Sequence, residues 1–250
     1  MERFSALTSR FLDYQNNASE APCFLERKRL DLKGVKAIVF DLDGTVADSL
    51  NRGHKPAWIE YCRQEGITLT PELLDLINQG ARNDQIFPKL LGRELEAQEL
   101  AGMAFKKEQV YLRTYLPEEI SGLTDFLNKL KAKGIRLAVA TSAPPEGRSF
   151  LMEKLGIMDQ FEVVIGAEDT VEGKPAPDAY RIAAERLGID PSECIAFEDT
   201  PFGVQSARNA GYKSVIGVAS TFKKIEGVSF MINNFRQIRL VNSSRSLRRS

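Results

Sequence analysis

Three carboxylates follow one apolar run near the start of the chain, in the stretch IVFDLDGTVADS at residues 38–49. Asp41 and Asp43 come directly after the run, and Asp48 lies a little further on. Like charges this close repel one another, so the rest of the chain has to supply a cation or a reaction that uses negative charge. We interpret Asp48 as a structural residue that caps a following helix.

Polar residues also follow three later apolar runs. Thr141 and Ser142 follow the second run, Lys174 lies in the loop after the third, and Glu198 and Asp199 end the fourth. In an open parallel α/β sheet, ligands bind beyond the carboxyl ends of the strands, which right-handed crossovers bring to one edge. Four carboxylates with a single lysine at this edge predict a bound cation, and an all-oxygen ligand set suits Mg²⁺. The predicted metal ligands are Asp41, Asp43, Glu198 and Asp199.

A magnesium ion with few protein ligands usually also binds phosphate oxygens, which predicts phosphoryl transfer. Asp41 would attack phosphorus and form an aspartyl-phosphate. The metal and Lys174 would offset the negative charge, the Thr141 hydroxyl would bind phosphoryl oxygens, and Gly44 would let the backbone approach the phosphate. Asp43 would protonate the leaving oxygen and later deprotonate the attacking water, from a distance of about 3 Å.

The elements that must position these residues alternate short apolar runs with segments of helical period, which is typical of a parallel sheet covered by helices. The predicted strands span 35–40, 136–141, 162–166, 194–198 and 214–218. The first two strands are separated by far more residues than one crossover helix needs, and this insert has a helical pattern.

We therefore predict an α/β fold with a Rossmann-like parallel sheet core, helices on both faces and an inserted small helical cap domain. A short amphipathic helix is also predicted near the N-terminus, from Phe4 to Tyr14. The predicted parts are an N-terminal extension over 1–34, the catalytic core over 35–49 and 118–240, the helical cap over 50–117 and a disordered tail over 241–250.

Composition limits the class of protein. The chain has 250 residues, of which 43% are hydrophobic, enough for one sizeable core with a modest insert. Lys and Arg number 34, and so do Asp and Glu, so no overall charge favours nucleic acid or an anionic membrane. Three widely separated cysteines indicate reduced thiols. We expect a cytoplasmic protein, a monomer or weak homodimer, that binds a small phosphorylated metabolite.

Four stretches together resemble the motifs of one known family. DLDGTVADS, ATS, GKPAPDAY and FEDTPFGVQSARNAG are similar, in order and spacing, to the motifs of the haloacid dehalogenase-like superfamily, in its branch with a helical cap after the first motif. The resemblance covers about residues 36 to 220. Within the branch, GKPAPD and FED most resemble beta-phosphoglucomutase and the related sugar-phosphate phosphatases. The resemblance implies the same fold and a Mg²⁺-dependent phosphoryl transfer.

The resemblance also implies roles for single residues. Asp41 is the nucleophile, and Asp43 is the acid/base that also binds Mg²⁺ through its carbonyl. Thr141 and Lys174 bind the phosphate, and Asp199 is a metal ligand. A sixth residue, Glu198, is either a ligand or a holder of metal-bound water.

Two cap residues extend the resemblance. His54, the only histidine, lies one position later than the histidine that assists proton transfer in the mutases, and its alternative is a surface histidine. Arg82, in QGARND, resembles a cap arginine that grips a second phosphate, and its alternative is a solvated loop residue. The predicted phosphate- and substrate-binding residues are Gly44, Thr141, Ser142, Lys174, His54 and Arg82.

Each motif taken alone also fits a purely structural role. Asp-Gly often forms a hairpin turn, Lys174 fits a solvated loop, and the residue pairs that follow the second and fourth runs fit helix caps. Four motifs at one sheet edge favour chemistry instead. We predict a Mg²⁺-dependent phosphatase of a small phosphorylated metabolite such as a sugar phosphate. Beta-phosphoglucomutase and inorganic pyrophosphatase activities fit the same core. A non-catalytic binding protein is disfavoured, because the motif residues are all present.

Overall fold

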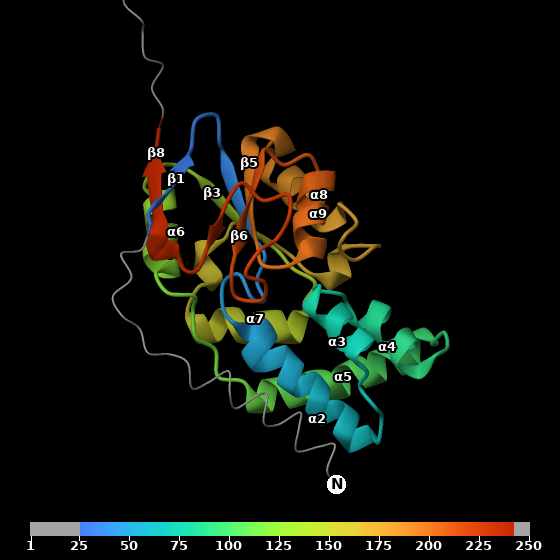
Figure 1. The fold of residues 1–250 in the computed structure, drawn as a ribbon. Coiled ribbons are helices and arrows are strands. Elements are labelled where there is room, and N and C mark those ends of the chain that lie inside the picture. The colour runs from blue at the N-terminus through green and yellow to red at the C-terminus, as the bar shows by residue number, and fades with distance from the viewer. Residues whose placement is uncertain (1–25, 243–250) are drawn as a thin grey trace, which may run out of the picture.

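The structure is a computed structural model that describes residues 26–242, so the amphipathic helix predicted near the N-terminus and residues 243–250 of the predicted tail lie outside it. Its main element is a parallel sheet with the strand order β4-β3-β2-β5-β6-β7 (Figure 1). The α/β fold class predicted from the sequence is confirmed. The strands are β2 (Ala37–Phe40), β3 (Arg136–Ala140), β4 (Val163–Ile165), β5 (Cys194–Glu198), β6 (Ser214–Val218) and β7 (Met231–Ile232).

Strand β2 lies in the middle of the sheet and is buried along its whole length. It pairs in parallel with β3 on one side and with β5 on the other. A strand that is covered on both faces needs apolar side chains at every position, and AIVF meets that need. The residue after β2 therefore emerges between the carboxyl ends of β3 and β5.

Helices cover both faces of the sheet. Ile38 and Phe40 pack into an apolar cluster with α6 and α7, whereas Ala37 and Val39 point to the other face and pack with α8 and α9. This alternation follows from the two-residue period of a strand. The helices are α6 (Leu123–Lys131), α7 (Pro145–Leu155), α8 (Asp178–Leu187) and α9 (Pro201–Asn209).

Four further helices form a layer of their own beside the carboxyl ends of the strands, and we call this layer the cap (Figure 1). The chain leaves β2 for the cap and returns to α6 through two segments that lie side by side, because Ile120 N donates to Val46 O at 2.8 Å. None of the helices within residues 26–242 is long and apolar enough to cross a membrane. The cap helices are α2 (Lys55–Glu65), α3 (Pro71–Asn78), α4 (Asn83–Leu91) and α5 (Ala97–Thr114).

The structure also contains strands that the sequence does not predict. One is the short edge strand β7. The others are β1 (Lys28–Asp31) and β8 (Ile238–Val241), which pair in parallel as a separate two-stranded sheet. Strand β1 lies within the predicted extension, and β8 reaches the first residue of the predicted tail. Both strands carry charged residues and meet across more than 200 residues of chain, so no local pattern marks them.

Candidate active site

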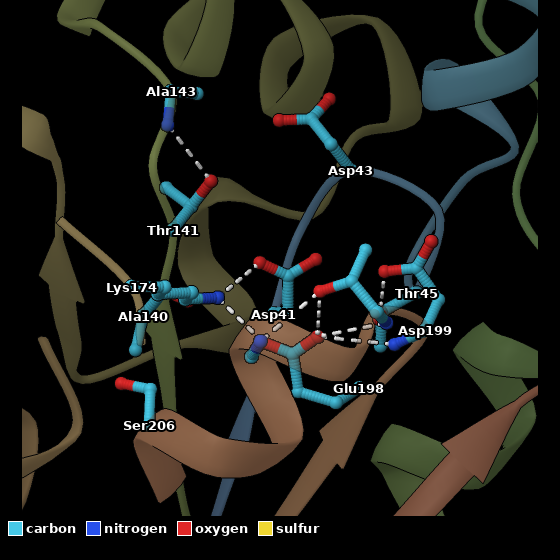
Figure 2. A network of polar contacts seen from close by, with 12 residues as sticks. Asp41, Asp43, Thr45, Ala140, Thr141, Ala143, Lys174, Glu198, Asp199 and Ser206 are labelled. Carbon is cyan, nitrogen blue, oxygen red and sulfur yellow. Dashed lines mark hydrogen bonds and ion pairs between the residues drawn. The ribbon is translucent and has the colours of Figure 1, made fainter. Parts of the chain in front are cut away.

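Lys174 joins the ends of three neighbouring strands. Its Nζ lies 2.6 Å from Asp41 Oδ1 and 2.5 Å from Glu198 Oε1, and it donates to the Ala140 carbonyl at 3.1 Å (Figure 2). The lysine is only 3% exposed. Its surroundings do not match the solvated-loop alternative. Lys174 holds the carboxylates that follow β2 and end β5 in one buried ion-pair network.

Burial and neighbouring charges shift the pKa values of this network. Burial raises the pKa of Asp41 to about 8, and the charges of Glu198 and Asp43 add to this effect against the opposing charge of Lys174. Burial lowers the pKa of Lys174, but the charges and hydrogen bonds of its two carboxylate partners outweigh burial and raise it overall. Lys174 thus stays cationic, and it offsets only part of the negative charge around it.

Glu198 organises the region with both of its carboxylate oxygens. Oε1 accepts from Lys174 and from the Tyr180 hydroxyl at 2.8 Å. Oε2 accepts from the backbone N–H groups of Asp199 at 3.1 Å and Thr200 at 3.4 Å. The side chain that caps α9 is that of Thr200, which accepts from the backbone N–H at position 203, so Glu198 and Asp199 are not the caps of this helix.

Three buried carboxylates form a group suited to a divalent cation. Oxygen atoms of Asp41, Glu198 and Asp199 all lie within 4.8 Å of one another. Burial and the charges of the other two carboxylates raise the pKa of Asp199 well above its usual range. Concentrated negative charge and all-oxygen donors are what a hard divalent cation requires. The cluster therefore offers ligands for such an ion.

Gly44 lies against this cluster. Its backbone has φ +93°, and a Cβ at this position would lie 1.9 Å from Asp199 Oδ2. Both the left-handed conformation and the close approach require glycine here. The residue therefore lets the loop after β2 pass directly over the carboxylate.

Asp43 lies apart from the three clustered carboxylates, with its side chain directed elsewhere (Figure 2). Its Oδ1 accepts from Ser49 Oγ at 2.6 Å and lies 3.1 Å from His54 Nε2. Burial raises the pKa of Asp43, but the charge and hydrogen bond of His54 and the hydrogen bond from Ser49 outweigh burial and lower it overall. The carboxylate of Asp43 thus does not share the environment of the other three predicted metal ligands.

His54 reaches Asp43 through an unusual turn. The segment Leu50–His54 is a π-helix, whose wider turn accommodates one residue more than an α-helical turn. This wider turn brings His54 Nε2 to 3.1 Å from Asp43 Oδ1. The His54 ring stacks on Tyr111, with centroids 4.0 Å apart, and its side chain is 12% exposed. It does not lie on the surface, as the alternative supposed.

The residues that follow β3 are also buried at this edge. Thr141 is 2% exposed, and its Oγ1 accepts from Ala143 N at 3.1 Å. Ser142 lines the pocket next to it. Neither residue caps α7, which begins at Pro145 without a side-chain cap.

Arg82 stands at the N-terminus of α4 and faces the same pocket. Its Nε lies 3.1 Å from Asp84 Oδ1, its Nη2 contacts Asp84 Oδ2, and its Nη1 donates to Thr170 Oγ1 at 2.8 Å. The side chain is 13% exposed, so it differs from the solvated loop residue that was the alternative. The arginine connects the cap to the loop after β4.

Sequence reasoning missed a buried ion pair on α5. Lys107 Nζ lies 2.8 Å from Glu108 Oε2 and 3.4 Å from His54 Nδ1, and it lies 5.5 Å from the centroid of the Trp58 ring. Both charged residues are almost fully buried. In the sequence they belong to the run KKEQ, which is typical of a solvated helix face. Position along the helix gives no usable signal, since Lys106 and Lys107 each lie one helical turn before a buried residue, Val110 and Tyr111 respectively.

One pocket lies between the sheet edge and the cap. All predicted site residues line it except Gly44 and Glu198. Gly44 lies against Asp199, and Glu198 contacts Lys174. The pocket brings a carboxylate cluster, a buried lysine and hydroxyl donors together beneath a helical cover. From the core it is lined by Asp41, Asp43, Thr141, Ser142, Ala143, Pro144, Lys174, Asp199 and Thr200, and from the cap side by Leu50, His54, Trp58, Ile77, Gly80, Ala81, Arg82, Asn83, Ile86 and Lys107.

Comparisons with known proteins agree with this geometry. The model of the haloacid dehalogenase-like hydrolases matches residues 35–211. Fructose-1-phosphate phosphatase YqaB of Escherichia coli (strain K12) is 30% identical over 181 residues, which cover 71% of this chain and 94% of that protein. Beta-phosphoglucomutase of Bacillus subtilis (strain 168) is 28% identical over 189 residues, which cover 72% and 82%.

A solved structure gives the same result for the fold. The crystal structure of a HAD hydrolase of family IA, variant 3, from Entamoeba histolytica HM-1:IMSS superposes with a TM-score of 0.72 at 30% identity. The superposition covers 82% of this chain and 96% of that one. These matches confirm the family resemblance that the four motifs predict.

Proposed function

We propose that this chain, which belongs to the haloacid dehalogenase-like hydrolase family, is a Mg²⁺-dependent phosphatase that hydrolyses a small phosphorylated metabolite, a sugar phosphate or a close relative. The observation that carries the proposal is the buried contact of Lys174 with Asp41 and Glu198 beside a further carboxylate, Asp199. This arrangement suits binding and transfer of a phosphoryl group. The similarity to a fructose-1-phosphate phosphatase supports the substrate class.

Asp41 is the proposed nucleophile. Its carboxylate attacks phosphorus, the bond between phosphorus and the ester oxygen breaks, and the phosphoryl group stays on Asp41 as an aspartyl-phosphate. Lys174 and the Thr141 hydroxyl, both at the same edge, bind phosphoryl oxygens and offset their charge. Water then attacks phosphorus and releases Asp41 and inorganic phosphate.

The residues fit a divalent cation, and we propose Mg²⁺ held by Asp41 and Asp199. Glu198 supports the site from behind, because both of its oxygens already accept hydrogen bonds. When bound, the ion supplies positive charge that keeps Asp41 ionised and neutralises phosphate oxygens.

Asp43 is the proposed acid and base. The leaving oxygen needs a proton in the first step, and the attacking water must lose one in the second. Asp43 Oδ1 and His54 Nε2 are in contact, so the proton can be shared and transferred between these two atoms. The lowered pKa of Asp43 keeps its carboxylate ionised, which is the form that the second step requires.

The test is phosphate release, with Mg²⁺, from a panel of hexose, pentose, triose and nucleotide monophosphates plus pyrophosphate. We expect release from sugar phosphates, and a loss of activity on the order of 10³-fold or more in Asp41→Asn. The matched control is Asp125→Asn, whose aspartate is exposed on α6 and pairs with Lys129. Release that survives in Asp41→Asn, or that EDTA does not affect, would contradict the mechanism.

The panel also separates the proposed activity from its relatives. β-Glucose 1-phosphate is assayed in parallel for glucose 6-phosphate. Formation of that isomer without matching phosphate release would make the protein a mutase, and release from pyrophosphate alone would make it a pyrophosphatase. Absence of any phosphate release would favour a binding protein on this fold.

A further inference from the structure

Both cations that the cap brings to the pocket already have a carboxylate partner from the cap. Asp84 binds Arg82 through two guanidinium nitrogens, Nε and Nη2. Glu108 binds Lys107 at 2.8 Å, and both residues of this second pair are at most 3% exposed. In each pair the partners are neighbours in the sequence, so the cap contributes each cation together with its own counter-charge.

The pairing of Arg82 uses the atoms that a phosphate would need. An arginine binds a phosphate best through two parallel N–H donors, and Asp84 occupies such a pair. The remaining nitrogen, Nη1, donates to Thr170 Oγ1 at 2.8 Å. All three guanidinium nitrogens are therefore engaged. A phosphate could take the fork only by displacing Asp84, whose like charge opposes its approach.

The core side of the pocket cannot supply the missing charge. Three carboxylates there, those of Asp41, Glu198 and Asp199, cluster around one ammonium group, that of Lys174. A fourth, that of Asp43, lies beside His54. A divalent cation leaves this side still negative before any substrate arrives. Among the described residues that line the pocket, the only lysines and arginines are Lys174, Arg82 and Lys107. A second phosphate group would therefore meet no unpaired cation.

The remaining cap surface suits an uncharged group. Apolar side chains line most of it. Asn83 adds a neutral amide group that can both donate and accept hydrogen bonds. Sugar and polyol hydroxyls can bind an amide, and the carbon faces of a sugar can pack on apolar rings. The apolar residues on this side are Leu50, Trp58, Ile77, Ala81 and Ile86.

We propose that the cap selects substrates by charge: the pocket accepts a phosphate monoester whose other end is uncharged, such as a sugar or polyol monophosphate, and discriminates against bisphosphates. Asp84 and Glu108 are the residues that determine this specificity, because each neutralises a cation that could otherwise bind a second phosphate. This inference rests on the proposed phosphatase function and narrows its substrate class.

The pairing of the two cap cations also affects whether the protein hydrolyses a sugar phosphate or isomerises it. An isomerase that works through an aspartyl-phosphate returns the phosphoryl group to a second hydroxyl of a sugar that already carries one phosphate. That sugar then carries two phosphates, and one of them must lie against the cap. Among the described residues, the two cap cations that line the pocket are both paired with carboxylates, which disfavours this intermediate and favours hydrolysis.

The test compares kcat/KM for two matched pairs of substrates, fructose 1-phosphate with fructose 1,6-bisphosphate and glucose 1-phosphate with glucose 1,6-bisphosphate. In the natural chain we expect the bisphosphate value to be lower by about tenfold or more. In Asp84→Asn the ratio of bisphosphate to monophosphate should rise by about fivefold to tenfold, because the Arg82 fork becomes free. Glu108→Gln is the second variant, and it should move the ratio in the same direction.

The control is Asp75→Asn, which removes one exposed carboxylate from α3 of the same cap and should leave the ratio unchanged. Thermal unfolding checks that each variant folds, and the ratio cancels losses that affect both substrates equally. Two results would overturn this inference but leave the proposed phosphatase function standing. One is a kcat/KM of the natural chain that is equal or higher for bisphosphates. The other is a bisphosphate-to-monophosphate ratio that stays unchanged in both Asp84→Asn and Glu108→Gln. Absence of phosphate release from every ester overturns the proposed function itself, and the inference with it.

Discussion

The core side and the cap side of the pocket treat buried charge in opposite ways. On the core side, the carboxylates outnumber the one ammonium group, that of Lys174, and the pKa of Asp41 rises to about 8. On the cap side, Lys107 and Arg82 each have one carboxylate partner. The charge on the cap side is therefore balanced within the chain, whereas the core side carries an excess of negative charge that a bound cation would reduce.

This difference separates chemistry from selection. Unbalanced negative charge is costly to bury, and it is retained where a bound cation and a reacting phosphate depend on it. Balanced pairs attract neither anions nor cations strongly, so the cap can shape the pocket without competing for the phosphate. Mutations that change the charge on each side should therefore have different consequences.

The largest effect is expected when Lys174 is replaced by methionine. Asp41 and Glu198 would then be buried without their counter-charge, and we expect a loss of about 3–5 kcal/mol in the free energy of unfolding. Turnover should fall by about 10²-fold to 10³-fold, because a phosphate-binding charge is lost. Urea unfolding with excess EDTA and phosphate-release assays with Mg²⁺ measure the two effects.

The matched replacement on the cap side is Lys107→Met, which alone leaves Glu108 buried and unpaired. The double variant Lys107→Met/Glu108→Gln removes both charges of the pair and should recover most of the lost stability. Lys174→Met/Glu198→Gln should recover much less, since Asp41 and Asp199 remain. Equal recovery in the two double variants would show that the two sides do not differ.

A smaller contrast is expected from two helical glycines that each contact a buried carboxylate. A Cβ at Gly203 of α9 would lie 1.9 Å from Glu198 Oε1, and a Cβ at Gly147 of α7 would lie 2.0 Å from Glu108 Oε1. Glu198 is fixed by hydrogen bonds on both oxygens, whereas Glu108 Oε1 has no hydrogen-bond partner and can move aside. We expect Gly203→Ala to cost about 2–3 kcal/mol of stability and Gly147→Ala about 1 kcal/mol.

The control is Gly102→Ala on α5, where nothing lies within 4 Å of the added Cβ. Because alanine favours a helix, this change should stabilise the protein by up to about 1 kcal/mol. Urea unfolding compares the three variants. A larger loss in Gly147→Ala than in Gly203→Ala would mean that the cap carboxylate is the more rigid of the two.

The core could be predicted from the sequence because its signals are local. Buried parallel strands are continuous apolar runs, and the polar residues that follow them, such as Asp41 and Thr141, need only the rule that strand ends share one edge. The pair β1 and β8 could not be predicted, because its two strands are far apart in the sequence and three of the four residues of β1 are charged.

The cap half of the site was less accessible to sequence reasoning. Nothing local distinguishes the buried Lys107 from the exposed Lys106 beside it, because only the packing of α5 against α2 and α7 decides which one faces inward. The position of Arg82 likewise depends on a distant contact, because its Nη1 donates to Thr170 Oγ1 in the loop after β4. Charges whose role depends on contacts between helices are read from the structure rather than from a motif.

A further expected effect is a pH dependence that belongs to the core side. The pKa of Asp41 is raised to about 8, and that of Asp199 is also raised. Between an unfolded value near 4 and these folded values, the folded chain without metal holds more protons than the unfolded chain, so stability falls as pH rises. The slope is at most about 1.4 kcal/mol per pH unit for each group. The lowered pKa of Asp43 means that its ionised form stabilises the folded chain. This contribution to stability is present above about pH 4 and is lost as the pH falls below it.

A divalent cation competes with these protons, so it should stabilise the protein more at high pH than at low pH. We expect the difference in Tm between Mg²⁺ and EDTA to widen by up to roughly 10 °C from about pH 5.5 to pH 8, since the slope allows about 3.5 kcal/mol per group and about 1 kcal/mol shifts Tm by roughly 2–4 °C in a chain of this size. Asp199→Asn should flatten this widening, whereas the cap variant Asp84→Asn should keep it. A gap that is the same at every pH would mean that the core carboxylates do not need the cation to carry their charge, and a gap that Asp84→Asn abolishes would mean that the cap shares in metal binding.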